Sequence, residues 1–358
     1  MIAASQHPIT GVKIATMKVV MPRYILAEFN THRMFSRNSA SSRAIPFEKM
    51  ANSVQKNPFI PIAWQKDHKG MQGTEYLDGL TASDLDPQYI PEYSAKQLLS
   101  DLWAGEWPDG SAAYYAIDRA RDLNQLGATK QLSNRLIEPF MWHTVLVTAT
   151  EWDNFFNLRC PQYAMSEVAD NFYKSKKDLM TKHGPGFALL SDLQWLEMNK
   201  GQADIHMMAL AESMYDCYNE AEFKVLQPGE WHIPYGDQIN GTELIAAYEK
   251  EYGEVLHTGN LYHFLVKRVS VARCARLSYE TLGDEPKINY LADIKLFDML
   301  SRNGHLSPFE HVARAMTEWE HEVFIKTEIV EDKPIQRRGW CANFNSFIPY
   351  RSLIENAA

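Results

Sequence analysis

The sequence has few cysteines and no closely spaced cysteine pair. Its four cysteines, Cys160, Cys217, Cys274 and Cys341, lie far apart among 358 residues. Zinc sites and disulfide frameworks usually show closely spaced cysteines, so this pattern argues against both. We therefore predict reduced thiols, no metal site and a cytoplasmic location.

Two further absences narrow the class of protein. No apolar run approaches the length of a membrane span, and the first residues, MIAASQHPITGVK, lack the basic start and apolar stretch of a signal peptide. The formal net charge of −9 is opposite in sign to the basic face that binds bulk nucleic acid. We expect a soluble protein with no membrane or nucleic-acid partner, whose few local arginines can still bind a small anion.

The overall composition is that of an ordinary globular protein. Hydrophobic residues make up 45% and charged residues 23%, and the length is ample for one large domain or two modest ones. Aromatic residues reach 12%, which suits flat ring-shaped ligands as well as an aromatic core. No internal repeat or low-complexity tract interrupts the chain.

The periodicity of apolar residues predicts a mixed α/β or α+β protein. Residues 13–29 are typical of a strand that is broken near Pro22. Helices are predicted at 111–127, with Ser111 as N-cap, at 203–222 and at about 290–304, and 129–160 is expected to be mostly helical. Residues 261–280 fit a helix or a strand. Residues 51–110 are expected to be a long irregular excursion, and residues 176–201 an insertion.

Residues 31–43 concentrate side chains that bind anions. THRMFSRNSASSR contains three arginines, several hydroxyl groups, an asparagine and a histidine. Guanidinium groups bind phosphate oxygens in pairs of hydrogen bonds and stay charged. Serine and asparagine side chains and free backbone amides complete such sites. Composition alone leaves two interpretations open, a phosphate-binding loop and a solvated basic loop.

The same residues resemble the RHRxxSxNxxSxRY motif of flavin-dependent thymidylate synthases (ThyX). The departures are Thr31, where the first arginine of the motif stands, and Ala44, where its tyrosine stands. The matching positions are His32, Arg33, Ser36, Asn38, Ser41 and Arg43.

Other segments are similar to further parts of the family. Residues 152–159 resemble its NxxNFxxLR helix, and Arg135, ahead of Pro139, resembles the arginine of its ARxxLP segment. Residues 202–205 resemble AQxEI, with a rival alignment at 164–168. Residues 304–311 (GHLSPFEH) resemble GHxSPFEH, and residues 275–279 (ARLSY) resemble AARVSY.

The last two segments precede the arginine-rich motif in the family but follow it here. We therefore hypothesise a circular permutation, which proteins tolerate when the ancestral termini are close and exposed. The hypothesis requires His311, His32 and Asn154 to lie around one pocket, and separate cores would contradict it. The expected fold is a single ThyX-like domain over 1–358, a mixed sheet flanked by helices, with insertions at about 51–110 and 165–200.

The resemblance also implies roles for individual residues. FAD is the implied cofactor, the implied assembly is a homotetramer, and Arg159 and Ser41 take the catalytic positions, Arg159 stabilising an enolate-like pyrimidine. The positions implied for FAD are Thr31, His32, Arg33, Asn38, Asn154 and His311. The positions implied for the nucleotide are Glu28, Ser39, Ser41, Arg43, Arg135 and Arg159. Cys160 has the alternatives of nucleophile and small buried residue, and the second is favoured.

The resemblance implies reductive methylation of dUMP to dTMP with methylenetetrahydrofolate and NADPH as co-substrates. Glu28 stands where the family usually has glutamine, and a carboxylate at that place can favour the amino group of cytosine. One alternative is therefore C5 hydroxymethylation or hydroxylation of dUMP or dCMP. A second alternative is a nucleic-acid-binding module built on the arginine- and serine-rich loop.

Overall fold

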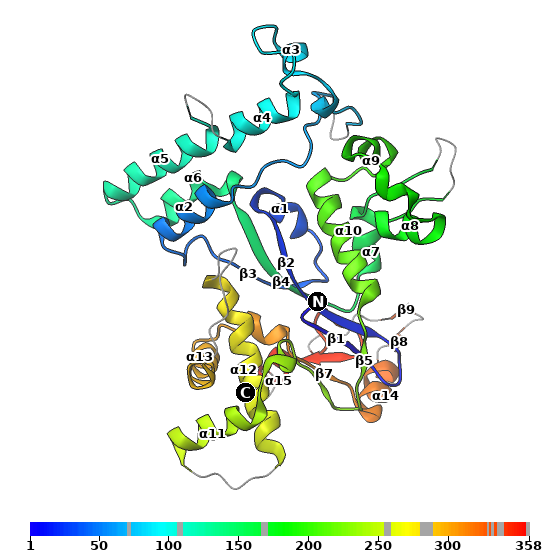
Figure 1. The fold of residues 1–358 in the computed structure, drawn as a ribbon. Coiled ribbons are helices and arrows are strands. Elements are labelled where there is room, and N and C mark those ends of the chain that lie inside the picture. Colours follow the sequence, from blue (N-terminus) through cyan, green and yellow to red (C-terminus); the bar gives the residue numbers. More distant parts are fainter. Residues whose placement is uncertain are drawn as a thin grey trace.

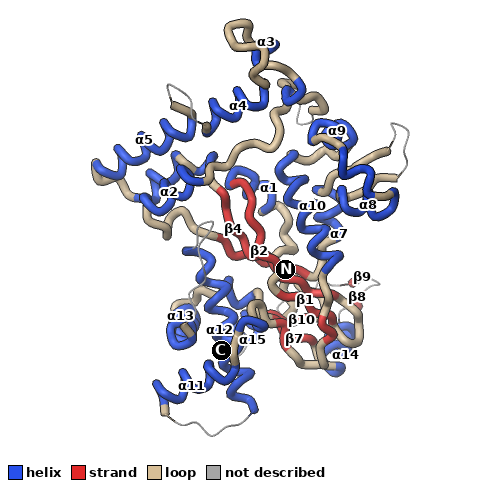
Figure 2. Tube along the Cα trace, viewed as in Figure 1, coloured by secondary structure: helices blue, strands red, loops and turns tan. Residues whose placement is uncertain are grey.

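A five-stranded mixed sheet forms the centre of the molecule (Figures 1 and 2). The computed structural model describes residues 1–69, 73–105, 110–165, 171–253, 259–279, 289–327, 329–330, 333–334 and 340–355. The strands of the sheet, in spatial order, are β3 (Ser36–Ser39), β4 (Trp142–Ala149), β2 (Lys13–Pro22), β1 (Ala3–Gln6) and β5 (Lys224–Val225). Among these five described strands, β1 and β5 pair in parallel and the other neighbours pair antiparallel. The predicted mixed sheet flanked by helices is confirmed.

The longest pairing joins β2 to β4, from Ala15 opposite Ala149 to Pro22 opposite Trp142. Strand β2 ends at Pro22, where the sequence predicted a break. The prediction of mostly helix over 129–160 is wrong for β4. Valine and threonine, which prefer strands, dominate WHTVLVTA, and a strand in the middle of a sheet buries both faces and shows no alternation of apolar and polar residues.

The two faces of the sheet carry different partners. Val145, Val147 and Ala149 pack with α7 (Asp153–Arg159) and α10 (Ile205–Glu220) in one apolar cluster. Leu146, which points the other way, packs against α12 (Gly259–Arg276) and the turn η6 (Leu277–Tyr279). A residue of β4 therefore belongs to the α7 side or the α12 side according to whether its number is odd or even.

The helices form three groups around the sheet (Figure 1). Short α1 (Leu26–Phe29) follows β2 through the turn η1 (Arg23–Ile25). The first group is α2 (Phe47–Lys56), α3 (Ala82–Leu85), α4 (Ala95–Ala104), α5 (Ala112–Gln125) and α6 (Lys130–Leu136), with the turns η2 (Leu77–Gly79) and η3 (Glu138–Phe140). Beside α7 and α10 lie α8 (Lys176–His183), η4 (Pro185–Leu189) and α9 (Asp192–Met198). The lower group adds η5 (Gly236–Gln238), α11 (Gly241–Tyr252), α13 (Tyr290–Arg302), η7 (Ser307–Glu310), α14 (Glu318–Thr327) and α15 (Tyr350–Glu355) to α12.

Two small sheets complete the fold. One consists of β10 (Phe347–Pro349), β7 (Ala313–Ala315) and β6 (Trp231–His232), in that order. The other pairs β8 (Ile329–Val330) with β9 (Lys333–Pro334). In the three-stranded sheet, β6 pairs with β7 and also contacts β1. The segment that follows η7 therefore lies next to the central sheet.

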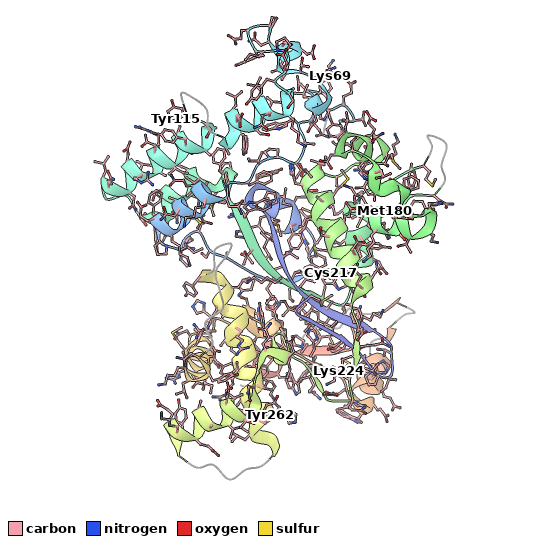
Figure 3. All side chains as sticks on the ribbon, viewed as in Figure 1. Lys69, Tyr115, Met180, Cys217, Lys224 and Tyr262 are labelled. Atoms are coloured by element: carbon pink, nitrogen blue, oxygen red, sulfur yellow. The ribbon has the colours of Figure 1, made fainter. Side chains whose placement is uncertain are left out.

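Several predicted helices are confirmed, and one expectation for the insertions is wrong. Helices α5, α10 and α13 lie within the predicted ranges, and Ser111 accepts a hydrogen bond from the amide of Tyr114 as N-cap. Residues 261–280, which fitted a helix or a strand, are largely α12. The region 51–110, marked by Lys69 in Figure 3, is not irregular throughout, because Ser94 caps the ten-residue helix α4.

All four cysteines are free thiols. Within the described ranges, no helix has the length and apolar content needed to cross a membrane. In the same part of the chain, no three side chains of the metal-binding types come together.

Candidate active site

The first half of the motif wraps around the end of α1. Thr31 donates its hydroxyl to the carbonyl of Glu28 at 2.7 Å. Arg37 Nη1 donates to the carbonyls of Phe29 and His32 at 3.3 and 3.0 Å. Thr31, which stands where the ThyX motif has its first arginine, therefore caps the end of α1. Arg37, which the sequence did not single out, holds the loop that follows.

Glu28, His32 and Arg159 meet in one group, which we name the Arg159 cluster. Arg159 Nε donates to His32 Nε2 at 3.1 Å, and Arg159 Nη1 forms an ion pair with Glu28. The Arg159 and Glu28 side chains are 22% and 29% exposed, so solvent reaches both. Three positions that the sequence assigned to nucleotide or cofactor therefore lie together.

His32 is held as a neutral acceptor. Its ring is buried and meets Phe155 edge-on with 4.9 Å between ring centres. Burial, with added repulsion from Arg159 and Arg37, lowers the pKa of His32 to about 4. Because arginine only donates, His32 Nε2 carries no proton, and the single proton of the neutral ring sits on Nδ1.

The second half of the motif rests on the end of α12 and on α6. Asn38 donates to the carbonyl of Cys274 at 2.6 Å, and the Ser41 amide donates to the carbonyl of Ser278 at 3.0 Å. Buried Asn134 donates to the carbonyl of Ser42 at 2.6 Å. The segment ARLSY therefore touches the motif, although more than two hundred positions separate them in the chain. Asn134, adjacent to the predicted Arg135, is a support that the sequence did not reveal.

Arg33, Arg43 and Asn154 are exposed, and within the described residues neither arginine has an acidic partner. Arg135 is also exposed and lies 3.4 Å from Glu138. Ser39 ends β3 opposite Val145. The motif edge of the sheet thus presents two arginines that are free to bind an anion.

His311 lies elsewhere. Its ring is fully buried, and Nδ1 hydrogen-bonds the Thr148 hydroxyl at 2.8 Å, on the α12 side of the sheet. His32 packs with Phe35 and Phe155 on the α7 side. The expectation that His311, His32 and Asn154 surround one pocket is therefore wrong for this chain. The reason is the alternation of β4, which turns Thr148 away from α7.

The segment that contains His311 nevertheless adjoins the motif, because η7 contacts β3. Glu310 lies near Arg37, whose pKa is lowered by burial against the opposing effect of that carboxylate. Glu310 also forms an ion pair with Arg351 at 2.6 Å. Burial raises the pKa of Cys160 to about 12, so this thiol is poorly suited to act as a nucleophile.

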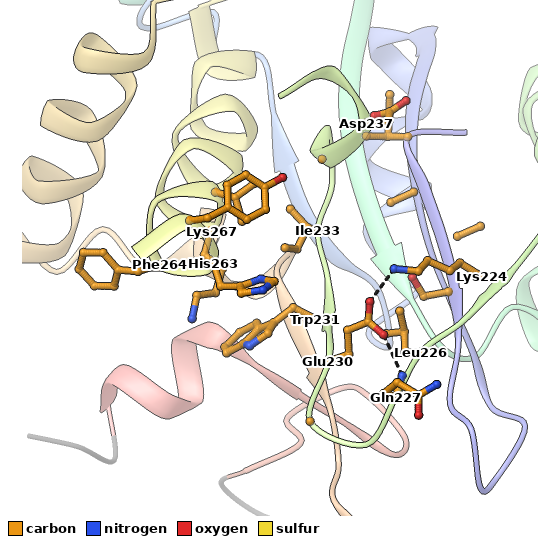
Figure 4. A pocket seen from close by; sticks show the side chains of 18 of the residues that line it. Lys224, Leu226, Gln227, Glu230, Trp231, Ile233, Asp237, His263, Phe264 and Lys267 are labelled. Atoms are coloured by element: carbon orange, nitrogen blue, oxygen red, sulfur yellow. Dashed lines mark hydrogen bonds and ion pairs between the residues drawn. The ribbon is translucent and has the colours of Figure 1, made fainter. Parts of the chain in front are cut away.

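A cavity of about 1090 Å³ lies apart from the motif, between β1, the segment from Lys224 to Trp231 and the first part of α12 (Figure 4). Glu230 bonds Lys224 at 2.5 Å and the amide of Gln227 at 2.8 Å. Lys267 lies over the ring of Trp231 at 4.3 Å. Lys224, at this cavity, is also labelled in the lower half of Figure 3.

The chain matches no family model and no curated protein. Among solved structures it is similar to a UMP/dUMP methylase, PolB from Streptomyces cacaoi, bound with 5-Br UMP. The TM-score is 0.32 and the identity 14%, over 58% of this chain and 69% of that chain. A likeness of this size decides neither the fold family nor the reaction.

Proposed function

We propose that this protein binds a flavin and a pyrimidine deoxynucleotide and alters the pyrimidine at C5, as a divergent flavin-dependent thymidylate synthase. The proposed reaction is methylation of dUMP to dTMP with methylenetetrahydrofolate and NADPH. The observation that carries the proposal is the Arg159 cluster, which joins Arg159 to His32 and Glu28, 127 and 131 positions earlier in the chain. In a solvated basic loop we would expect His32 to be exposed, but its ring is buried.

The residues at the motif edge fit the demands of FAD. Arg33 is an exposed cation without an acidic partner among the described residues, as a diphosphate requires. His32 is neutral, and Asn154 exposes its amide on α7. Thr31 and Asn38 stand at motif positions but already bond the protein. FAD, when bound, supplies the reducing equivalents, and the buried His311 is left out of the set that contacts it.

Arg159 is the group we propose to act on the pyrimidine. Glu28 and His32 hold its Nη1 and Nε, and its Nη2 has no hydrogen-bond partner among the described residues. A guanidinium fixed on two sides presents its remaining N–H groups in a defined direction. Such a donor stabilises negative charge on a pyrimidine carbonyl when C5 becomes nucleophilic. Ser39, Ser41, Arg43 and Arg135 are proposed to bind the rest of the nucleotide.

Glu28 bears on which base is bound. Its carboxylate already neutralises Arg159, so a cytosine amino group would share the same oxygen atoms. We propose that Glu28 gives the site its choice between dUMP and dCMP. The Glu28→Gln variant should shift the ratio of the two binding constants toward dUMP. An unchanged ratio would remove Glu28 from this role without affecting the flavin site.

The same site could yield either of two kinds of product at C5: a methyl group, or a hydroxymethyl or hydroxyl group. Mass analysis of the nucleotide after turnover separates them. The contacts of η6 and η7 with β3 support a permuted chain, because the segments that precede the motif in the family lie beside it here. The separation of His311 from His32 counts against it.

We propose a homo-oligomer, and active monomers in light scattering would refute that.

The decisive experiment is the visible absorption spectrum of the purified protein with FAD, followed by titration with dUMP and dCMP. We expect a bound flavin whose band shifts with one nucleotide. The Arg43→Ala variant should lose most of this response, and Arg119→Ala should keep it, because Arg119 is exposed on α5 and paired with Asp118 and Asp122. No flavin binding, together with salt-sensitive binding of duplex DNA, would support the nucleic-acid-binding alternative instead.

A further inference from the structure

The cavity shown in Figure 4 offers room for a small molecule away from the motif. Its volume of about 1090 Å³ is close to the upper end of the range of small-molecule sites. One wall is formed by β1 and the segment from Lys224 to Trp231, and the other by the first half of α12. None of the described residues assigned above to flavin or nucleotide lines it.

The walls of this cavity leave apolar surface in contact with water. Ile2, Trp231, Ile233 and Tyr262 line it and are half-buried, and Phe264 at its rim is 39% exposed. Apolar surface in a concave site favours a ligand with an apolar body. Because three of these five side chains are aromatic, a flat ring fits them best.

Lys267 provides a positive charge in the same wall. Its Nζ lies 4.3 Å from the ring centre of Trp231 and 5.6 Å from that of Tyr350, at the distances where aromatic rings attract a cation. The side chain is half-buried, and no acid among the described residues forms an ion pair with it. Burial lowers the pKa of Lys267, and repulsion from Arg314 adds to this effect. A bound anion would supply the counter-charge that this ammonium group needs.

The other charged groups of the wall are neutralised or distant from Lys267. Lys224 bonds Glu230 at 2.5 Å, and Glu230 also accepts a backbone amide at 2.8 Å. His263 lies near enough to Glu230 to favour its ionised form. Figure 4 shows Asp237 on the far side of the cavity from Lys267. A ligand near Lys267 therefore meets one positive charge, which matches a monoanion better than the dianion of a phosphate monoester.

We propose that this cavity is a second ligand site that binds an aromatic monocarboxylate, with Lys267 holding the carboxylate and the apolar wall holding the ring. The ammonium group has three N–H donors, and no described residue accepts from them. An ion pair that is partly shielded from solvent is stronger than one at an open surface. The site is separate from the one proposed for flavin and nucleotide, so both can be occupied together.

The test compares two probes that share a ring system and differ in charge, 2-naphthoate and the uncharged 2-naphthalenemethanol. Isothermal titration calorimetry of the full chain should show 2-naphthoate binding about tenfold more tightly or better. Equal affinity for the two probes, or no binding of either, would overturn the proposal. Tighter binding of 2-naphthyl phosphate than of 2-naphthoate would overturn the choice of a carboxylate.

A matched set of variants tests the role of Lys267. Lys267→Met removes the charge and keeps most of the length of the side chain, so the two probes should bind alike. Lys267→Arg should keep the preference for 2-naphthoate. Lys295→Met is the control, because Lys295 is 59% exposed on α13 and pairs with Glu251 at 2.7 Å. A preference that survives in Lys267→Met, or that is lost in Lys295→Met, would refute the role of Lys267.

The indole N–H signal of Trp231 reports where the probe binds. In ¹H–¹⁵N spectra, with the signal assigned through Trp231→Phe, it should shift when 2-naphthoate is added to the natural chain. The signal of Trp152, which is 2% exposed on the α7 side of the sheet, should stay in place. A shift of Trp152 without one of Trp231 would place the probe elsewhere and overturn the proposal. These measurements need no flavin or nucleotide, so their outcome is separate from that of the proposed function.

Discussion

Replacing Arg159 by lysine isolates the geometry of the Arg159 cluster from its charge. The guanidinium bonds His32 through Nε and Glu28 through Nη1, and its Nη2 is available to a ligand. Lysine keeps the positive charge but has one nitrogen, which cannot hold both partners and point at a third group. Arg159→Lys should therefore disturb the nucleotide more than the fold.

The expected magnitudes follow from exposure. Arg159 and Glu28 are 22% and 29% exposed, so Glu28 can rehydrate, and the free energy of unfolding should fall by about 1 kcal/mol or less. A hydrogen bond from a charged donor to the nucleotide contributes about 1.5–3 kcal/mol. Its loss should weaken nucleotide binding about 10- to 100-fold.

The assay is titration of the flavin-loaded protein with dUMP and with dCMP, next to urea unfolding of the same samples. Arg119→Lys provides the control, since that side chain is 66% exposed and bonds only acids on its own helix. Unchanged nucleotide affinity in Arg159→Lys would show that the cluster only anchors α7 to the loop. A loss of several kcal/mol in stability would show that the exposure argument is wrong.

Three further predictions concern buried polar groups. Asn134→Ala removes the hydrogen bonds to the carbonyls of Ser42 and Ile45, so urea unfolding should show a loss of about 2 kcal/mol, against a few tenths for exposed Asn219→Ala. Asp293→Asn leaves Arg276 and Arg273 without their buried counter-charge and should cost about 3 kcal/mol, whereas Asp298→Asn, at a partly exposed pair, should cost under about 1 kcal/mol. Burial lowers the pKa of His143, His232 and His311 from 6.5 to about 3, so below pH 6.5 the unfolded chain takes up protons that the folded protein refuses. The stabilisation from these neutral histidines should be fully present above pH 6.5, and the free energy of unfolding should fall by about 2 kcal/mol per histidine at pH 5. In urea unfolding, His143→Phe should lose about 2 kcal/mol less of its free energy of unfolding than the natural chain over that interval.

Sequence patterns predicted those elements whose packing leaves a simple trace in one segment. Helix α10 has one apolar face against the sheet, and α5 has a capping serine, so both could be found from periodicity and cap. Strand β4 could not, because burial on both faces removes the alternation that distinguishes a strand from a short buried helix. Its valines and threonines were the only available signal.

The site shows the same limit at the level of single residues. The resemblance pointed to Glu28, His32 and Arg159, and the fold brings them into contact. It also pointed to His311, whose side chain faces the other side of the sheet. A motif records which residues occur and at what spacing, whereas the face that each occupies is set by strand register. Supports such as Arg37 and Asn134 bond backbone carbonyls, which no sequence pattern identifies.

The position of each strand in the sheet explains why the polar side chains near β3 differ from those of β2 and β4. Strand β3 is four residues long and lies at the edge of the sheet, so the arginines that flank it reach solvent and can meet a ligand. Strands β2 and β4 are interior, and polar side chains such as Thr16 and Thr148 must satisfy one another there. The edge is thus suited to bind an anion, whereas polar groups in the interior pair with one another. Contact between η7 and β3 brings the segment that ends at His311 next to the motif edge.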